Sequence, residues 1–133
     1  MATADKEQAI TITMVGADEA HTLVSSGHGY LDVRMSEDFD KGHAASAHNV
    51  PYYVHVAPEG REKSPHFEEE VASLFGNEDH FIVGCFTGTR SKLATSDLLH
   101  AGFKNVRNLQ GGYRGFLQST SQQHALDQQP SVN

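Results

Sequence analysis

The sequence predicts a three-layer α/β/α fold with a central, mainly parallel sheet. Three observations carry this prediction. Short apolar runs alternate with helix-like periodic segments from residue 10 to residue 118, Gly and Pro residues separate these segments, and the length of 133 residues suits one domain with one core. Strands that alternate with helices form βα units, so we expect parallel strands, helices on both faces and right-handed crossovers.

The expected strands are short runs of apolar or β-branched residues. They lie at residues 10–13, 30–33, 47–50, 81–84 and 106–109. The first run alternates with a period of two, and Pro51 stops the third. The run 81–84 (Phe-Ile-Val-Gly) is the most apolar, which predicts a central place in the sheet.

The expected helices lie between these strands. The first has Ala17, Ala20, His21 and Val24 on one face and ends at Gly27, and a short second helix is capped by Ser36. A third opens at Ser64-Pro65 and runs to Gly76. A fourth spans 91–100 before Gly102, and a closing helix is centred on 113–117. Glu37 and Asp38 complement the dipole in the first turn of the second helix. Ser64 before Pro65 is the favoured order of cap and first-turn proline.

The expected domain covers residues 8–118. Residues 52–63 contain Pro58 and Gly60, and we expect them to form a loop. Residues 119–133 are rich in Ser and Gln, which predicts a flexible polar tail. Nothing in the sequence specifies an oligomeric state.

Composition is that of an ordinary globular protein, with 38% hydrophobic and 20% charged residues. The net charge of −7 argues against nucleic acid or an anionic membrane as a partner, because both require a basic surface. No apolar stretch approaches the ~18 residues that cross a membrane, and the N-terminus shows no signal-peptide pattern. We therefore expect a cytoplasmic location, with a plastid as the alternative if a transit peptide has been removed.

Cys85 is the single cysteine, which excludes an internal disulfide and zinc sites built on cysteine pairs. It follows the expected central strand, at the edge where parallel sheets bind ligands. The loop 85–90 leads into a helix, so its backbone N–H groups form an anion-binding nest, and Gly88 allows the positive φ that turns them inward. The helix dipole and Arg90 favour the thiolate, which predicts a thiol pKa below its ordinary value of about 8.5.

Two interpretations of Cys85 stay open on this local chemistry. A single cysteine after an apolar run is commonly a buried structural residue. The electropositive loop instead predicts a nucleophile. The C-x4-R spacing does not decide between them, whereas the position between a strand and a helix favours the nucleophile.

Several spaced motifs resemble the rhodanese family, over essentially the whole chain apart from the first residues and the tail. They are Tyr30-Leu31-Asp32-Val33-Arg34, Glu37, Phe39, Gly42-His43-Ala44, Asn49-Val50-Pro51-Tyr52, Ile82-Val83-Gly84-Cys85 with Arg90, Ala101-Gly102-Phe103 and Gly111-Gly112-Tyr113. The segments 98–103 and 111–113 are similar to those of small plant sulfurtransferases. The resemblance implies a rhodanese-like version of the three-layer fold.

The resemblance also implies sulfur transfer by a ping-pong route. Cys85 would take the outer sulfur of thiosulfate, or of another persulfide donor, and hold it as a persulfide. Cyanide or a thiol, such as glutathione or thioredoxin, would accept it, and no metal or other cofactor would be needed. The implied substrate-binding residues are Phe86, Thr87, Gly88, Thr89 and Arg90. A covalent intermediate divides a hard transfer into two steps, and backbone amides stabilise its charge.

Two alternative functions remain within this resemblance. Plant arsenate reductases have similar C-x4-R loops, and the same cradle would hold arsenate while Cys85 attacks arsenic. A non-catalytic rhodanese-like binding or regulatory module is the other alternative, and the presence of Cys85 counts against it. Phosphatase relatives have a loop one residue longer, which the spacing of Cys85 and Arg90 argues against. The loop has no lysine, so we expect thiosulfate to be a poor donor.

The remaining polar candidates receive structural interpretations. Nine histidines are scattered without metal-ligand spacing, and His43 is expected to make a structural hydrogen bond. Asp32 and Arg34 are expected to pair and fix a neighbouring loop. Arg61 and Lys63 lie in the expected loop 52–63 and are interpreted as solvated, with a place at the mouth of the pocket as the alternative.

The aromatic residues divide between core and site. Phe75, Phe81 and Phe103 are expected in the core, and Phe86 is expected to wall the pocket beside Cys85. Two positions depart from the family pattern. His48 stands where an aliphatic residue is usual, and Phe116 stands where tryptophan is frequent.

Overall fold

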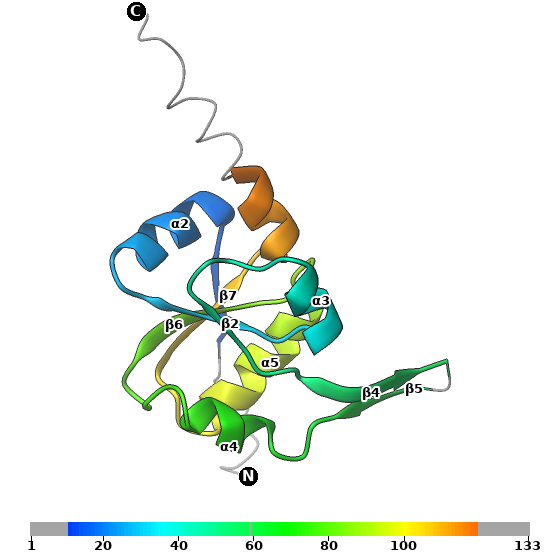
Figure 1. Ribbon diagram of the computed structural model, residues 1–133. Coiled ribbons are helices and arrows are strands. Elements are labelled where there is room, and N and C mark those ends of the chain that lie inside the picture. The colour runs from blue at the N-terminus through cyan, green and yellow to red at the C-terminus, as the bar shows by residue number, and fades with distance from the viewer. Residues whose placement is uncertain (1–10, 59, 120–133) are drawn as a thin grey trace, which may run out of the picture.

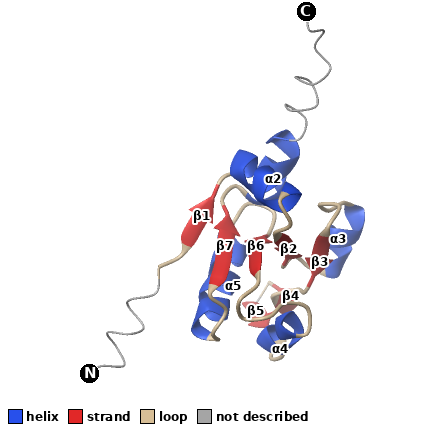
Figure 2. Cartoon of the chain, turned by 90° about the vertical axis from the view of Figure 1, so that its left-hand side faces the viewer, coloured by secondary structure: helices blue, strands red, loops and turns tan. Residues whose placement is uncertain are grey.

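The computed structural model describes residues 11–58 and 60–119 and has the predicted three-layer α/β/α architecture (Figure 1). Its parallel sheet has the strand order β1 (Thr13–Val15), β7 (Asn105–Leu109), β6 (His80–Gly84), β2 (Gly29–Asp32) and β3 (Ala47–Asn49). Helix α2 (Ala17–Ser25) and the helix at 112–119 cover one face, while α4 (Phe67–Ala72) and α5 (Thr89–His100) cover the other (Figure 2). Helix α3 (Ser36–Lys41) follows β2 at the carboxyl edge of the sheet.

The strand β6 occupies the centre of the sheet, as its apolar sequence predicts. Its side chains alternate between two cores. Phe81 and Val83 face α4 and α5, together with Leu31, Val33, Phe67, Val71, Phe75, Leu98, Phe103 and Val106. Ile82 faces the other side, together with Val15, Ala20, Tyr30, Ala44, Leu109, Tyr113 and Phe116. Burial of both faces of the sheet leaves its carboxyl edge as the place for a site.

The expected loop at 52–63 is wrong. The structure forms an antiparallel hairpin there, with β4 (Tyr53–Ala57) paired to β5 (Gly60–Lys63). Pro58 and Gly60 flank the reversal of the hairpin, which is why their presence suggested a loop. The hairpin extends away from the main sheet (Figure 1).

Several element boundaries also differ from the prediction. Strand β1 is displaced towards residue 15, because Thr13–Val15 pair with β7. Met35, not Ser36, occupies the cap position of α3, and no side chain caps that helix. Residues 64–66 form a turn instead of a first helical turn, so α4 begins only at Phe67.

Two helix ends near the site also shift. Helix α5 begins at Thr89, two residues before the predicted start, and therefore shortens the loop that follows Cys85. The closing helix spans 112–119, and its buried Ser119, which we assigned to the tail, donates a hydrogen bond to Asp18. Residues 8–10 of the expected domain and residues 120–133 of the expected tail lie outside the described residues.

The predicted core aromatics are confirmed, since Phe75, Phe81 and Phe103 are buried. The two departures from the family pattern fit their surroundings. His48 is exposed on the edge strand β3 and meets Phe75 edge-on, and Phe116 is buried against Tyr30.

Tyr30 supplies a test of this packing. Its hydroxyl is buried against Gly84 and has no hydrogen-bond partner among the described residues. Burial is the largest cause that raises the pKa of this hydroxyl, so it stays protonated. Because an unpaired buried hydroxyl costs desolvation, we expect Tyr30→Phe to raise the free energy of unfolding in urea by about 1 kcal/mol.

Tyr52→Phe is the matched control, because the Tyr52 hydroxyl donates to Asp97 Oδ2 at 2.6 Å. The same chemical change should lower the free energy of unfolding there by about 1–2 kcal/mol. A loss of stability in Tyr30→Phe would show that its hydroxyl has a partner after all.

Candidate active site

The candidate site lies where two neighbouring parallel strands end. The register of β2 and β6 places Asp32 opposite Gly84, so the residues that follow these strands, Arg34 and Cys85 among them, come to the same carboxyl edge of the sheet. The backbone N–H of Val33 donates to the carbonyl of Gly84 at 2.9 Å and extends the pairing to the last residue of β6. Parallel pairing thus joins residues that are about 50 positions apart in the chain.

The loop after Cys85 turns its N–H groups towards the sulfur. The N–H of Gly88 donates to Cys85 Sγ at 3.0 Å. Gly88 has a φ of 113°, which confirms the predicted left-handed conformation, and it is the N-cap residue of α5. Arg90 and Ser91, in the first turn of α5, also direct backbone N–H groups at the thiol. The sulfur therefore lies in a concave set of backbone donors.

The closing helix holds the opposite side of this loop. The N–H groups of Tyr113 and Arg114 donate to the carbonyls of Cys85 and Phe86, at 2.7 and 3.1 Å. Gly112 makes this approach possible, because a Cβ there would lie 2.6 Å from the Cys85 carbonyl oxygen and its φ is 60°. The carbonyls of the loop are thereby turned away from the sulfur and towards the helix.

Two opposing effects set the pKa of Cys85. Burial is the largest and raises the pKa, because only 1% of the residue is exposed. The Ser91 hydroxyl, which also lies 3.1 Å from the Gly88 carbonyl oxygen and 2.5 Å from Asn108 Oδ1, favours the thiolate together with the N–H groups of Ser91, Gly88 and Arg90, and these donors lower the pKa below its ordinary value. The predicted direction is confirmed, and so is the contribution of the helix start, because the N–H groups belong to the first turn of α5 and its cap, whereas the Ser91 side chain takes the place expected of the Arg90 guanidinium.

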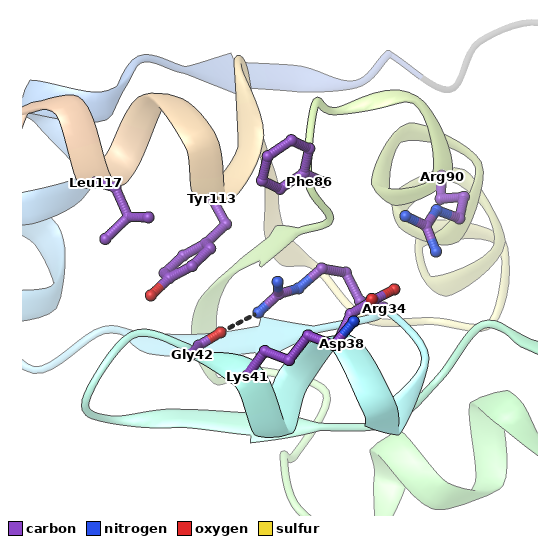
Figure 3. Close-up of a pocket in the computed structure, with 8 residues that line it drawn as sticks. All are labelled: Arg34, Asp38, Lys41, Gly42, Phe86, Arg90, Tyr113 and Leu117. Carbon is purple, nitrogen blue, oxygen red and sulfur yellow. Dashed lines mark hydrogen bonds between the residues drawn. The ribbon is translucent and has the colours of Figure 1, made fainter.

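A cavity of about 480 Å³ opens beside the loop (Figure 3). It is lined by Arg34, Asp38, Lys41, Gly42, Phe86, Arg90, Tyr113 and Leu117. Tyr113 and Leu117 come from the closing helix, and Asp38 and Lys41 come from α3 (Figure 3). Phe86 walls this cavity, as predicted. Arg34 is paired with Asp32, and the two further cations Lys41 and Arg90 against the single carboxylate of Asp38 favour an anionic ligand there.

Arg34 is held rigidly in the wall of this cavity. Its Nε and Nη2 donate to the Asp32 carboxylate at 2.8–3.1 Å, and Nη2 also donates to the Gly42 carbonyl at 2.8 Å. The guanidinium lies 4.6 Å from the centre of the Tyr113 ring. The expected Asp32–Arg34 pair is confirmed, and the pair is buried. Arg34 also lines the cavity, a role that its place in the sequence does not indicate.

A second cavity, of about 470 Å³, shares Asp38 and Arg90 with the first. It is lined by Met35, Asp38, Tyr53, Arg61, Thr87, Thr89 and Arg90. Thr87 and Thr89 belong to the loop region, and Tyr53 and Arg61 come from the β4–β5 hairpin. Arg61 is exposed, as expected, but it also lines this cavity, whereas Lys63 forms ion pairs with Glu68 and Asp97.

The structure thus gathers the candidate residues around Cys85 but not in one place. Gly88 and Arg90 contact the sulfur through backbone N–H groups, Phe86 lines the first cavity, and Thr87 and Thr89 line the second. Sequence reasoning missed other residues around the site: Ser91, Arg34, Asp38, Lys41, Tyr113 and Leu117. Parallel register is the signal that would have found Arg34, since it follows β2, the strand next to β6, by two residues.

Within the described part of the chain, the histidines that the sequence offered as candidates are not part of the site. His43 Nδ1 lies 2.8 Å from the Phe39 carbonyl oxygen, which confirms the expected hydrogen bond, and its ring stacks on Phe39. Among residues 11–58 and 60–119 no group of three or more histidine, cysteine, aspartate or glutamate side chains is arranged to hold a metal ion. In the same part of the chain no helix is long and apolar enough to cross a membrane.

The fold and the site together define a class: an α/β protein that presents one cysteine in an anion-binding loop at the end of its central strand. Comparison with known proteins gives the family. Residues 16–119 match the Rhodanese-like domain family, so the chain belongs to that family.

Two curated relatives are plant proteins. The chain is 49% identical over 107 residues to the Arabidopsis thaliana protein named "Thiosulfate sulfurtransferase 16, chloroplastic", covering 80% of this chain and 88% of the relative. It is 41% identical over 124 residues to "Thiosulfate sulfurtransferase 18" from the same organism, covering 92% and 90%. The solved structure of a human single-domain sulfurtransferase is 26% identical, with a TM-score of 0.62, covering 81% of this chain and 97% of that one.

The Ser91 hydroxyl provides a test of the thiol pKa. We expect Ser91→Ala to raise the pKa of Cys85, because it removes a donor that favours the thiolate while burial continues to favour the thiol. At pH 7 the fraction of thiolate should fall. The pH dependence of Cys85 alkylation by iodoacetamide measures this change, and its midpoint should move to higher pH.

Ser96→Ala is the control, since Ser96 lies on the same helix α5 beyond the first turn. Its alkylation profile should match that of the wild type. An unchanged midpoint in Ser91→Ala would show that the backbone donors alone set the pKa.

Proposed function

We propose that this protein is a sulfurtransferase that moves sulfur from thiosulfate, or another persulfide donor, to an acceptor through a persulfide on Cys85. The observation that carries the proposal is the Cys85 thiol itself, held by the Gly88 N–H at 3.0 Å and lowered in pKa by surrounding donors. A thiol whose pKa is lowered ionises more readily and depends less on a separate base. The names of the two plant relatives support thiosulfate as the donor.

In the first half-reaction the Cys85 thiolate attacks the outer sulfur of thiosulfate. A bond forms between Sγ and that sulfur, the sulfur–sulfur bond of thiosulfate breaks, and sulfite leaves with the electron pair. The first cavity suits the donor, because Arg34, Lys41 and Arg90 present cationic groups to an anion. The product is a Cys85 persulfide anion, and charge is conserved across the step.

The concave set of N–H groups then stabilises the persulfide. A sulfur–sulfur bond is about 2.05 Å long, so the outer sulfur extends from the buried Sγ towards the loop donors and the cavity. These donors are fixed before the reaction by Gly88 and by the hydrogen bonds of Tyr113 and Arg114. Preorganised donors stabilise developing charge without reorganisation during the step.

The burial of Cys85 favours sulfur transfer over the alternative of arsenate reduction. Thiosulfate offers a terminal sulfur, a single atom that can enter the loop and meet Sγ. The arsenic atom of arsenate is enclosed by four oxygens, so it approaches a buried Sγ less readily than the terminal sulfur of thiosulfate does. The alternative of a binding module is opposed by the lowered pKa of Cys85, which a purely structural thiol does not require.

Acceptor and location complete the proposal. In the second half-reaction cyanide or a thiol takes the sulfur, with glutathione and thioredoxin as the thiols to test. A cytoplasmic location remains our expectation, and the chloroplastic name of one relative supports the plastid alternative.

The persulfide itself is the first test. Reduced protein is exposed to thiosulfate and its intact mass is measured beside that of Cys85→Ser. We expect the wild type to gain one sulfur atom, which cyanide then removes, and the variant to gain none while it keeps its fold by circular dichroism. An adduct that persists in Cys85→Ser would overturn the role of Cys85. No adduct on the wild type, with arsenate reduction by the same sample, would replace sulfur transfer by the alternative.

Arg90 provides a separate test of donor binding. Arg90→Ala keeps the backbone N–H that faces the sulfur but removes the guanidinium from the first cavity. We expect the KM for thiosulfate to rise about tenfold, the effect of one lost charge-assisted hydrogen bond.

Lys92→Ala is the matched control. Lys92 is exposed two residues further along α5 and lines neither cavity, so its KM should stay within about twofold of the wild type, as expected for a screened surface charge. Equal effects of the two variants would indicate a general charge effect and would contradict a specific role of Arg90.

A further inference from the structure

The second cavity is larger than the donor requires. Thiosulfate has five non-hydrogen atoms, whereas a volume of about 470 Å³ equals roughly fifteen water molecules in the liquid. The first cavity already offers Lys41 and Arg90 to the donor, neither of them in an ion pair among the described residues. A separate pocket that meets the first at Asp38 and Arg90 is therefore space for another substrate.

The chemistry of this pocket favours an anion. Two guanidinium groups, from Arg61 and Arg90, line it, and Asp38 is the only acidic residue among its described lining residues. None of the ion pairs within residues 11–58 and 60–119 involves Arg61 or Arg90. The hydroxyls of Thr87 and Thr89 add neutral donors. In a chain with a net charge of −7, unneutralised arginines at one pocket point to an anionic ligand.

The hairpin that carries Arg61 is fixed at its base. Lys63, two residues beyond Arg61 on β5, bonds to Glu68 of α4 at 2.6 Å and to Asp97 of α5 at 3.0 Å. Asp97 also accepts the Tyr52 hydroxyl just before β4. The Arg61 guanidinium lies 5.7 Å from the centre of the Tyr53 ring, which is itself a lining residue. Arg61 is thus presented beside the cysteine loop by an anchored strand.

We propose that this second cavity, lined by Arg61, Tyr53, Thr87 and Thr89, binds the carboxylate of a thiol acceptor and so selects acidic thiols over neutral ones. This inference rests on the proposed function. The acceptor sulfur attacks the outer sulfur of the Cys85 persulfide and passes its proton to that atom. The bond from Sγ to the outer sulfur breaks, its electron pair returns to Cys85 as the thiolate, and the acceptor leaves as a persulfide.

Because the two half-reactions are separate, they can be tested separately. Persulfide formation with thiosulfate is followed by intact mass, and transfer from the isolated persulfide enzyme is followed with 3-mercaptopropionate, an acidic thiol, and 2-mercaptoethanol, a neutral one. We expect Arg61→Gln to lower kcat/KM for 3-mercaptopropionate about tenfold, the effect of one charge-assisted hydrogen bond, and Arg61→Lys to lower it less. Transfer to 2-mercaptoethanol and persulfide formation should match the wild type.

Lys104→Gln is the control for net charge. Lys104 is an exposed cation that precedes β7, at the opposite end of the sheet from the site, and its partner is Glu78. It should reproduce the wild type with both thiols.

The outcomes separate the two proposals. Absence of the persulfide on the wild type would refute sulfur transfer from thiosulfate and this inference with it. A normal persulfide, with Arg61→Gln equal to the wild type for both thiols, would overturn the acceptor subsite alone. Slower persulfide formation in Arg61→Gln, with unchanged transfer, would also overturn it, because Arg61 would then belong to the donor.

Discussion

The orientation of the Cys85 loop depends on hydrogen bonds from a helix that begins 27 residues later in the chain. Tyr113 and Arg114 bind the carbonyls of Cys85 and Phe86, and Gly112 is the residue that lets the two backbones approach. Once these carbonyls point to the helix, the N–H groups further along the loop face the sulfur. The anion-binding property of the loop therefore comes from tertiary packing as much as from its own sequence.

Burial and hydrogen bonding oppose each other at the sulfur. A thiol with 1% exposure is costly to ionise, and four donors from three residues reverse that preference. The same burial strengthens those hydrogen bonds, since the local dielectric is low. The loop thus combines exclusion of water with stabilisation of negative charge, a combination suited to a sulfur anion that must not be lost to solvent.

Positive charge gathers around the site although the chain as a whole is negatively charged. A protein of net charge −7 places Arg34, Lys41, Arg61 and Arg90 around one cysteine. Arg34 is buried and needs Asp32, because an unpaired buried guanidinium would cost several kcal/mol. The other three line the cavities without ion pairs among the described residues, so their charge remains available to ligands. The electrostatic field of these nearby side chains, and not the net charge of the chain, decides which ligands the two cavities attract.

The sequence by itself determined the alternation of strands and helices, the central place of 81–84, the cysteine loop and the left-handed Gly88, because these depend on local periodicity and backbone preference. It could not place Arg34, Lys41, Arg61, Ser91 or Tyr113 at the site. Pro58 and Gly60 indicated a loop where the structure forms the β4–β5 hairpin. The donors to the Cys85 thiol lie on both sides of the start of α5, which the local sequence signals placed two residues too late. Only the tertiary structure decided these positions, since strand register and helix docking bring together residues that no local pattern connects.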